Sequence, residues 1–399
     1  MTTVVAYQPE AFTDLLPARA RFALDHEAAP PRLNVCLPHL HREHVFGGMT
    51  SALELAAHLA GHYVGLRVVV LNPLPPQAGR IALAPILGRD ETAIETVSLH
   101  DDAALVFHPG DILLCPNWRT VLVWERLAGL CAAAGLAPPP FYYFIQDWEP
   151  GFYPMGLKHL AAEGTYRHAG HGLPIFNSRE LHRFFLARGY PCDKAVVIRP
   201  SLDNFLLYLL SNLDFKLPPK RADRVNVLVY GRPGHHRNCF PAVLACLAAY
   251  SEVHGRTQGR GVDFYSAGMP HEDVSFANGM TLRSLGTLSM PDYAATLLQS
   301  HVGLALMASP HPSYPPLEMA CFGLEVLTNA YPGKDLSREH PRIRNIDPTD
   351  PVRAAGELAR AIDTAVPRAG RQSPAIFPKS LSPLSWPANF QQAGLPVLL

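Results

Sequence analysis

Residues 302–328 of the chain read VGLALMASPHPSYPPLEMACFGLEVLT, and they predict two buried strands separated by a loop and a short helix. The apolar runs 302–307 and 325–328 have the length of strands. Between them, Ser313 or Tyr314 can begin a helix that carries proline in its first turn, and a glycine ends it. A strand, a crossover helix and a second strand form the repeating unit of a parallel sheet. The stretch therefore places the chain in the α/β class.

The same alternation of strands and helices occurs in two series along the chain. Strand-length apolar runs cover residues 33–37, 66–71, 112–115, 141–145 and 195–198 in the first series, and residues 225–230, 262–265, 281–285, 302–307 and 325–328 in the second. Amphipathic stretches at 49–63 and 124–134 supply crossover helices. Continuous apolar runs are typical of strands buried in parallel sheets. We therefore predict two Rossmann-like domains with mainly parallel sheets that face a central cleft, where ligands bind.

The length of 399 residues is enough for two domains with separate cores. We place an N-terminal domain at 1–204 and a C-terminal domain at 205–366, because a segment with apolar, Pro and Lys residues separates the two series. Residues 367–399 are rich in Pro and Ser, and we expect them to form a tail that packs across the domains. The apolar run 205–210 could touch a membrane surface. Since no basic amphipathic helix accompanies it, we expect it to pack against the protein.

Charge and cysteine content exclude several classes of protein. Lys plus Arg and Asp plus Glu both number 34, so the net charge is zero and no overall basic field favours nucleic acid. The seven cysteines are scattered without C-x-x-C spacing, which is typical of a reducing compartment. No run of about 18 uncharged apolar residues occurs, and Glu10 and Asp14 interrupt the start of the chain. We expect a cytoplasmic protein with no transmembrane segment, which could work at the inner face of the membrane.

Two glycines follow the first predicted strand and precede a helix. Gly47 and Gly48 would let backbone N–H groups approach an anion at a helix N-terminus, although a tight turn between strand and helix needs the same pair. The loop also carries His39, His41 and His44. Because no Cys or His set in the sequence has zinc-finger spacing, we interpret these histidines as residues that line the cleft, and we predict no metal.

The loop after strand 141–145 carries two carboxylates, an amide and three aromatic rings. Aromatic faces suit sugar rings, while carboxylates accept hydrogen bonds from hydroxyls or act as bases. Asp147 and Glu149 resemble a metal-binding D-x-D variant, but we favour acceptor binding, with Trp148 and Glu149 in contact with the acceptor. In the alternative, Asp147 caps the next turn and Trp148 belongs to the core.

Cations follow the first strand of the second series. Arg232 and Arg237 lie in a glycine-bearing turn between strand and helix, where forked N–H donors and a helix N-terminus suit a diphosphate. In group transfer they would stabilise the leaving diphosphate as its charge develops. The turn lacks the Walker pattern G-x-x-x-x-G-K-[ST]. Surface arginines without a ligand are the alternative.

Glu318 is expected in the early part of the helix after residues 307–313. A carboxylate in this place, beside the cleft, can accept hydrogen bonds from both hydroxyls of a ribose. The alternative is an acidic residue in the first turn that compensates the helix dipole.

Four strings together resemble the GT-B glycosyltransferases, specifically the WsaF-type rhamnosyltransferase group near glycosyltransferase family 4. They are YYFIQDWEPGFYPMG (142–156), YGRPGHHRN (230–238), LGTLSMPDYAATLLQS (285–300) and LMASPHPSYPPLEMACFG (306–323). Between about residues 33 and 365 they occur in the expected order. The resemblance implies GT-B architecture, an acceptor bound by the N-terminal domain, a nucleotide-sugar donor bound by the C-terminal domain, and no obligatory metal or other cofactor.

The resemblance also implies roles for single residues. Gly47 and Gly48 match the Gly-rich loop of the N-terminal domain, which contacts phosphate or acceptor. The positions that it assigns to the donor are Arg232, Arg237, Ser313, Tyr314 and Glu318, the last of them for the ribose. Family 4 enzymes usually carry a second Glu eight residues earlier, and Pro310 stands there in this chain. His311 is our candidate to replace it, and Thr287 stands where related proteins use a basic residue.

We therefore predict a glycosyltransferase that moves L-rhamnose from dTDP-L-rhamnose onto an oligosaccharide or lipid-linked glycan in surface polysaccharide biosynthesis. If the reaction uses a base, Asp147 is the first choice and His39 the second. A retaining outcome follows from the kinship to family 4 alone. Two alternatives are a non-catalytic nucleotide- or glycan-binding protein of the same fold, which Pro310 motivates, and a nucleotide-sugar epimerase. The sequence leaves the oligomeric state open.

Overall fold

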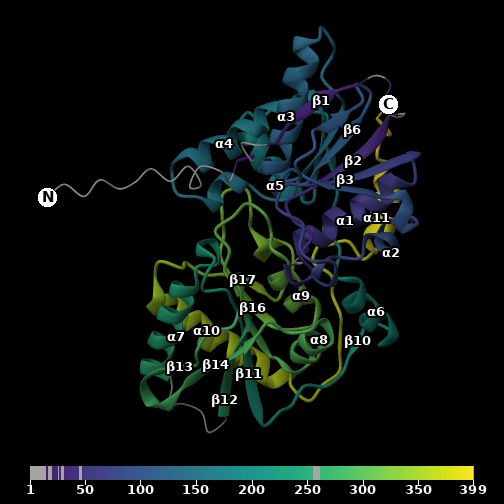
Figure 1. Cartoon of the computed structure of the whole chain (residues 1–399). Coiled ribbons are helices and arrows are strands. Elements are labelled where there is room, and N and C mark those ends of the chain that lie inside the picture. The colour runs from purple at the N-terminus through teal and green to yellow at the C-terminus, as the bar shows by residue number, and fades with distance from the viewer. Residues whose placement is uncertain are drawn as a thin grey trace, which may run out of the picture. The chain divides into compact units, whose positions relative to one another are not determined.

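The computed structural model describes residues 15–16, 20–25, 27, 31–44, 47–254 and 261–398. The chain divides into two compact units, each built on its own sheet (Figure 1). The first unit comprises residues 1–177, 185–198 and 386–399, and the second comprises residues 178–184 and 199–385. The main change of unit thus falls after residue 198, a short distance before the boundary that we placed at 204.

The first unit contains a seven-stranded sheet in which all neighbouring strands are parallel, in the order β4-β3-β2-β6-β7-β8-β9. Its strands are β2 (Arg32–Leu37), β3 (Gly65–Val70), β4 (Glu95–Ser98), β6 (Ile112–Cys115), β7 (Phe141–Ile145), β8 (Leu173–Phe176) and β9 (Val196–Val197), and β1 (Phe22–Leu24) pairs with β5 (Leu105–Phe107) in a separate parallel pair. Its helices are α1 (Gly47–Ala60), α2 (Leu83–Leu87), α3 (Trp118–Ala133), α4 (Leu157–Thr165) and α11 (Trp386–Ala393), and α5 (Arg179–Ala187) contains residues of both units.

The second unit contains a second seven-stranded sheet, in the order β13-β14-β12-β11-β15-β16-β17. All its neighbouring strands are parallel except β13 and β14. Its strands are β11 (Arg224–Gly231), β12 (Gly261–Gly268), β13 (Val274–Ser275), β14 (Thr281–Gly286), β15 (Val302–Leu304), β16 (Glu325–Thr328) and β17 (Ile343–Asn345), and β10 (Lys216–Leu217) pairs antiparallel with β18 (Ser373–Pro374). Its helices are α6 (Asn204–Asn212), α7 (Phe240–His254), α8 (Met290–Gln299), α9 (Tyr314–Cys321) and α10 (Pro351–Ala365).

Alternating residues of β11 belong to two different cores. Val227 and Val229 pack in one cluster with residues of α7 and α10, while Leu228 packs in another with residues of α8 and α9. Because successive side chains of a strand point to opposite faces, helices cover both faces of this sheet. The predicted α/β class and the mainly parallel sheets are therefore confirmed in each unit.

All ten predicted strand runs fall on strands, but the sequence missed β4, β8, β13 and β17 of the two sheets and the strands β1, β5, β10 and β18. One of these, β8, contains Pro174, which lacks an N–H and so weakens the sequence signal for a strand inside a sheet. The neighbouring β9 pairs only with Ile175 and Phe176, so Pro174 lies beyond the part of β8 that carries a second neighbour. Helix α3 also begins earlier than predicted, because Asn117 and Thr120 form a reciprocal capping box at its start.

The predicted tail, 367–399, is divided between the two units. β18 pairs with β10 in the second unit, and α11 packs against α1 in the first, where the buried rings of Trp386 and Phe390 stack at 5.3 Å. The apolar run 205–210 forms part of α6. Its Leu206 and Leu210 are buried as expected, whereas other side chains of the run, such as Tyr208, are exposed.

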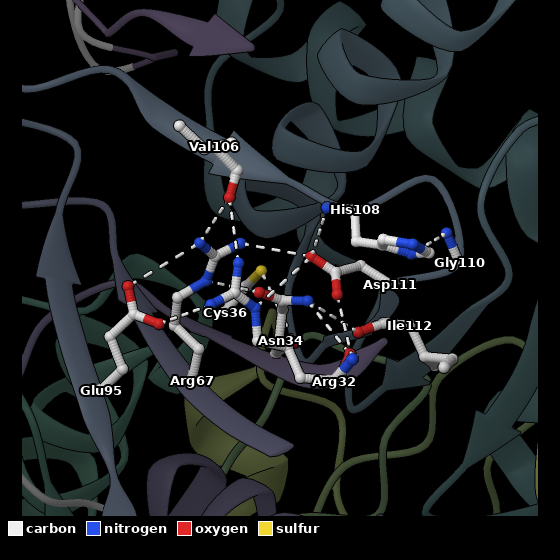
Figure 2. A network of polar contacts seen from close by, with 10 residues as sticks. All are labelled: Arg32, Asn34, Cys36, Arg67, Glu95, Val106, His108, Gly110, Asp111 and Ile112. Carbon is white, nitrogen blue, oxygen red and sulfur yellow. Dashed lines mark hydrogen bonds and ion pairs between the residues drawn. The ribbon is translucent and has the colours of Figure 1, made fainter. Parts of the chain in front are cut away.

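A network of buried charges lies at the amino-terminal edge of the first sheet (Figure 2). The Arg67 side chain is almost inaccessible, and it reaches Asp111, which is fully buried, at 3.5 Å. Arg67 also donates to Asn34 Oδ1 at 2.7 Å and to the Val106 carbonyl at 2.8 Å. Its guanidinium lies over the Phe107 ring, 4.5 Å from the centroid. Buried charges persist only when paired in this way, so the network fixes the starts of β2, β3 and β6.

Candidate functional site

The turn after β11 begins with a close approach of two strands. A side chain at Gly231 would place its Cβ 1.9 Å from Ser266 Oγ, and one at Gly268 would approach the Gly231 carbonyl oxygen to 2.5 Å. Gly268 also has φ of 145°, which side-chain-bearing residues rarely adopt. Glycine is therefore required at the ends of both strands, at the carboxyl edge of the sheet, where α/β sheets bind ligands.

Four cationic or titratable side chains gather in this turn, namely Arg232, His235, His236 and Arg237. An Arg232 guanidinium nitrogen lies 2.6 Å from His235 Nε2. Burial and the charges of Arg232, Arg237 and His236 lower the pKa of His235, so this imidazole is held neutral. Both predicted arginines thus act on one small region, and the like charges gathered there favour an anionic ligand such as a diphosphate.

The loop after β15 is tied to that turn and to β16. Ala308 N donates to the Arg237 carbonyl at 2.7 Å. The Asn329 side-chain amide forms two hydrogen bonds with the Met307 backbone. Its Oδ1 accepts from Met307 N at 2.7 Å, and its Nδ2 donates to the Met307 carbonyl at 3.1 Å. The buried Lys334 ammonium donates to the same carbonyl at 2.7 Å. The start of the predicted donor loop is therefore fixed by side chains that the sequence did not single out.

The end of this loop is constrained at Ser313. Ser313 has φ of 68°, a conformation that non-glycine residues adopt at a cost of about 1–3 kcal/mol and that concentrates at functional sites. Its N–H donates to Nδ1 of the buried His311 at 3.0 Å, so the neutral imidazole carries its proton on Nε2. The His311 ring lies 5.6 Å from that of Tyr314, the first residue of α9. The structure thus brings these three predicted donor residues together.

Helix α9 begins at Tyr314, with Ser313 as its N-cap residue, and Gly323 follows its end in the left-handed conformation, as predicted. Glu318 is the exception. It lies beyond the first turn, so neither the expected early position nor the dipole-compensating alternative holds. The start at Tyr314 was one of the two predicted, and it makes Glu318 the fifth residue of an eight-residue helix.

The Glu318 carboxyl group is buried and accepts one hydrogen bond, from the Tyr293 hydroxyl to Oε2 at 2.8 Å. Burial raises the pKa of Glu318 to about 7, the hydrogen bond from Tyr293 opposes this shift, and the nearby charge of Asp203 adds to it. Tyr293 belongs to α8 and was not selected from the sequence, although it lies in one of the strings that carried the resemblance. Its place four residues after the Ser289 N-cap on an apolar helix face was the signal.

The loops of the first unit follow the carboxyl ends of its strands. Helix α1 begins at Gly47, so the two glycines stand at a helix N-terminus as predicted. A Cβ at Gly48 would meet Gln146 Oε1 at 3.5 Å, an ordinary contact, so this glycine is not sterically required. His39 follows β2, and its ring lies 6.0 Å from that of His41. Since β6 separates β2 from β7, His39 and Asp147 follow strands about 10 Å apart.

Several polar groups of the loop after β7 form hydrogen bonds with one another or with other residues of the first unit. Asp147 is buried, its Oδ1 accepts from Trp148 N at 2.8 Å, and its carbonyl accepts from the Tyr166 hydroxyl at 3.1 Å. The Trp148 ring is half-buried, with the Arg188 guanidinium 4.6 Å from its centroid and its Nε1 donating to the Tyr190 hydroxyl at 3.3 Å.

Glu149 lies at the start of another helix. Its Oε2 accepts from the backbone N–H of Trp118, the first residue of α3, at 2.7 Å. A carboxylate in this position satisfies an open N–H group and interacts favourably with the helix dipole. The loop therefore contains an anchoring carboxylate where the sequence predicted an acceptor-binding one.

Across the described part of the chain, no three His, Cys, Asp or Glu side chains gather in a way that could hold a metal ion. None of the helices in the same described residues is long and apolar enough to cross a membrane.

Solved structures share this two-sheet architecture at low sequence identity. Sucrose-phosphate synthase from Thermosynechococcus elongatus superposes with a TM-score of 0.54 at 12% identity, over 91% of this chain and 94% of that one. WaaG, a glycosyltransferase involved in lipopolysaccharide biosynthesis, superposes with a TM-score of 0.50 at 11% identity, over 83% and 90%. The fold is that of the GT-B glycosyltransferases, with two Rossmann-like α/β units.

The chain belongs to the WsaF family. The model of the WsaF N-terminal domain matches residues 32–179 and that of the C-terminal domain matches residues 225–359, which together are more than two thirds of the chain. The O-antigen biosynthesis protein RfbC of Myxococcus xanthus is 33% identical over 190 residues, which is 48% of this chain. The match spans only 14% of the length of that protein.

Proposed function

We propose that this chain is a glycosyltransferase that moves a sugar from a nucleotide-sugar donor to a saccharide acceptor in surface polysaccharide biosynthesis. The observation that carries the proposal is the group of Arg232, Arg237 and the neutral His235 at the carboxyl edge of the second sheet. Membership of the WsaF family and the similarity to an O-antigen biosynthesis protein support it.

In this proposal the second unit binds the donor. Arg232 and Arg237 hold the diphosphate and stabilise the charge that develops on it as the bond to the sugar breaks. Glu318 accepts hydrogen bonds from the ribose through Oε1, because the Tyr293 hydroxyl already occupies a site on Oε2. Ser313 and Tyr314 contact the donor beside them. His311 donates a hydrogen bond from its protonated Nε2 to the donor sugar. It takes the place of the Glu that family 4 enzymes usually carry where this chain has Pro310.

The first unit binds the acceptor. Trp148 offers a flat ring, Gly47 and Gly48 offer the N-terminus of α1, and Asp147 is the base if the reaction needs one, ahead of His39. We assign Glu149 to the anchoring of this loop on α3. The acceptor is an oligosaccharide or a lipid-linked glycan, and we propose that the reaction proceeds at the cytoplasmic face of a membrane without an obligatory metal.

For the donor we propose dTDP-L-rhamnose, on the support of the WsaF family. A thermal-shift panel of dTDP, UDP and GDP with their sugar conjugates tests this choice, because a ligand at a hundredfold excess over its Kd stabilises the folded state by about 2.7 kcal/mol. We expect a selective rise in Tm with dTDP compounds, unchanged by EDTA. A selective rise in Tm with another nucleotide would contradict the choice of donor but not the proposal of a glycosyltransferase.

Pro310 favours a second candidate, a non-catalytic binding protein of the same fold. Donor turnover separates the two, since a binder leaves the nucleotide sugar intact over hours of incubation. Release of the nucleoside diphosphate, lost in Arg232→Ala, is expected for the transferase. Conversion of the sugar without any acceptor would indicate an epimerase instead.

A further inference from the structure

The Lys220 ammonium lies at the ends of two helices. Its Nζ donates to the Leu297 carbonyl at 3.3 Å and to the Ser300 carbonyl, both at the end of α8. It also donates to the Phe322 carbonyl, just after α9, at 3.0 Å. The last carbonyls of a helix have no partner within the helix and carry partial negative charge, so a cation stabilises both ends. Lys220 thus joins α8 to α9 through three hydrogen bonds.

The two helices joined by Lys220 carry the two partners of the candidate ribose site. Tyr293 lies four residues before Leu297 on α8, and Glu318 lies four residues before Phe322 on α9. Residues four apart share one face of a helix. The contacts of Lys220 therefore lie one turn from the hydrogen bond between Tyr293 and Glu318, on both helices.

We infer that Lys220 is a positioning residue for nucleotide recognition, because it holds α8 and α9 together and so keeps the Tyr293 hydroxyl on Glu318 Oε2. With Tyr293 in place, Glu318 Oε1 faces its ligand in one orientation, and the binding site needs no rearrangement to accept a ribose. The inference rests on the proposed function, since it assumes that Glu318 binds the nucleotide.

Lys220 differs from the cations beside it in the chain. Lys216 and Arg221 form ion pairs on the surface, with Asp214 and Asp223. Lys220 instead turns inward, and the three contacts given above are all with neutral carbonyls. Burial together with the charge of Arg342 lowers the pKa of Lys220 to about 7. Burial removes the hydration of a charged group, which costs free energy. The buried position of Lys220 therefore indicates that its contacts hold it there.

Lys220→Met tests the inference, with Arg342→Met as the matched control. Arg342 donates to the Gly323 carbonyl at 2.7 Å, so it touches the chain after α9 but makes no such bridge to α8. With dTDP as the titrant in calorimetry, we expect K220M to raise Kd about tenfold and R342M to leave it within about twofold. Lys220→Gln, which keeps two N–H donors, is the substitute if K220M does not fold.

A double-mutant cycle with Tyr293→Phe separates positioning from a general loss of stability. If Lys220 acts through the Tyr293 hydroxyl, the double variant K220M/Y293F binds dTDP no more weakly than the worse single variant. Multiplying losses would overturn the inference. So would equal losses of affinity in K220M and R342M.

Hydrogen exchange keeps this test distinct from the test of the proposed function. Amides at the ends of both α8 and α9 should exchange faster in K220M, whereas R342M should affect α9 alone. If the unmodified protein binds none of the nucleotides, the proposed function is wrong. The role of Lys220 in nucleotide recognition is then wrong as well, even if the hydrogen-exchange pattern is as expected. If dTDP binds and the exchange of α8 is unchanged in K220M, only the inference about Lys220 is wrong.

Discussion

Charged side chains at the amino-terminal edge of each sheet meet opposite charges, whereas like charges gather at the carboxyl edge of the second sheet. In the first unit, Arg67 and Asp111 are buried together at the amino-terminal edge (Figure 2). At the same edge of the second sheet, Arg224 pairs with Asp263 at 2.6 Å on the surface. Glu325, the first residue of β16, is buried at this edge too and lies 3.9 Å from Arg342 and 3.7 Å from Arg344. Glu318, near the carboxyl edge, is also buried, but its hydrogen bond comes from a neutral hydroxyl.

This contrast separates paired charges that stabilise the fold from the like charges that we propose for donor binding. Around Asp111, opposite charges meet and neutralise one another, whereas Arg232 and Arg237 bring like charges to one turn. Burial shifts the pKa of Glu318 upward and that of His235 downward, and such shifted groups concentrate at binding and catalytic sites. Opposite charges thus stabilise the amino-terminal edges of both sheets, and we propose that the like charges at the carboxyl edge of the second sheet bind the donor.

The largest effect is expected from Asp111→Asn, which removes the charge and leaves Arg67 buried. Breaking a buried pair costs about 3–5 kcal/mol, so the first unit should lose that much in its free energy of unfolding. Urea denaturation measures the loss, and calorimetry should show unchanged affinity of the folded protein for nucleotides. Asp263→Asn is the matched control on the other sheet, and its denaturation midpoint should not move. An equal loss in both variants would contradict the contrast.

The second effect in size is expected at the donor residues. Arg232→Ala and Glu318→Ala should each weaken the binding of a nucleotide sugar about a hundredfold, since each removes a hydrogen bond to a charged group worth about 1.5–3 kcal/mol. Arg338→Ala, at an exposed arginine, should change nothing. Affinity close to that of the unmodified protein in both variants would remove the donor site from the second unit.

Glu149→Ala tests whether the loop after β7 is built for structure or for acceptor binding. Loss of the hydrogen bond from Trp118 N to Glu149 Oε2 should cost about 1 kcal/mol of stability, the usual value for a helix cap. Glu149→Gln keeps an acceptor oxygen and should lose less. Thermal denaturation gives the stability, and acceptor KM gives the other role. A raised KM with unchanged Tm would return Glu149 to acceptor binding.

A pH dependence set by Glu318 is also expected. Its pKa in the folded protein, about 7, lies above the ordinary 4.5, so the folded protein holds a proton that the unfolded chain releases between these values. Stability without ligand should therefore fall as pH rises from 5 to 8. Nucleotide affinity should change in the opposite sense and improve about tenfold from pH 6 to 8, because the ionised carboxylate is the stronger acceptor. In Glu318→Gln both dependences should disappear, and a persistent one would point to another group.

Much of the fold follows from local sequence. The apolar runs predicted ten of the fourteen strands in the two seven-stranded sheets, and Pro at the start of α9 and Gly after its end predicted that helix. The sequence could not give the role of Glu149, because its partner Trp118 lies 31 residues earlier. Tyr293 lies 25 residues from Glu318 in the chain, so the sequence could not show that the two are partners. Nor could it show that Lys334 and Asn329 form hydrogen bonds with the Met307 backbone.

The sequence by itself determined the α/β class, the two series of strands, the loops that carry charged and aromatic residues, and the motifs that resemble the WsaF group. These depend on periodicity and on residue types close together in the chain. Only the tertiary structure decided which charged side chains meet opposite charges and which lie beside like charges. The burial and the partner of a carboxylate come from segments far apart in sequence, so the sequence could not show that Asp111 pairs with Arg67 or that Glu318 accepts a hydrogen bond from Tyr293.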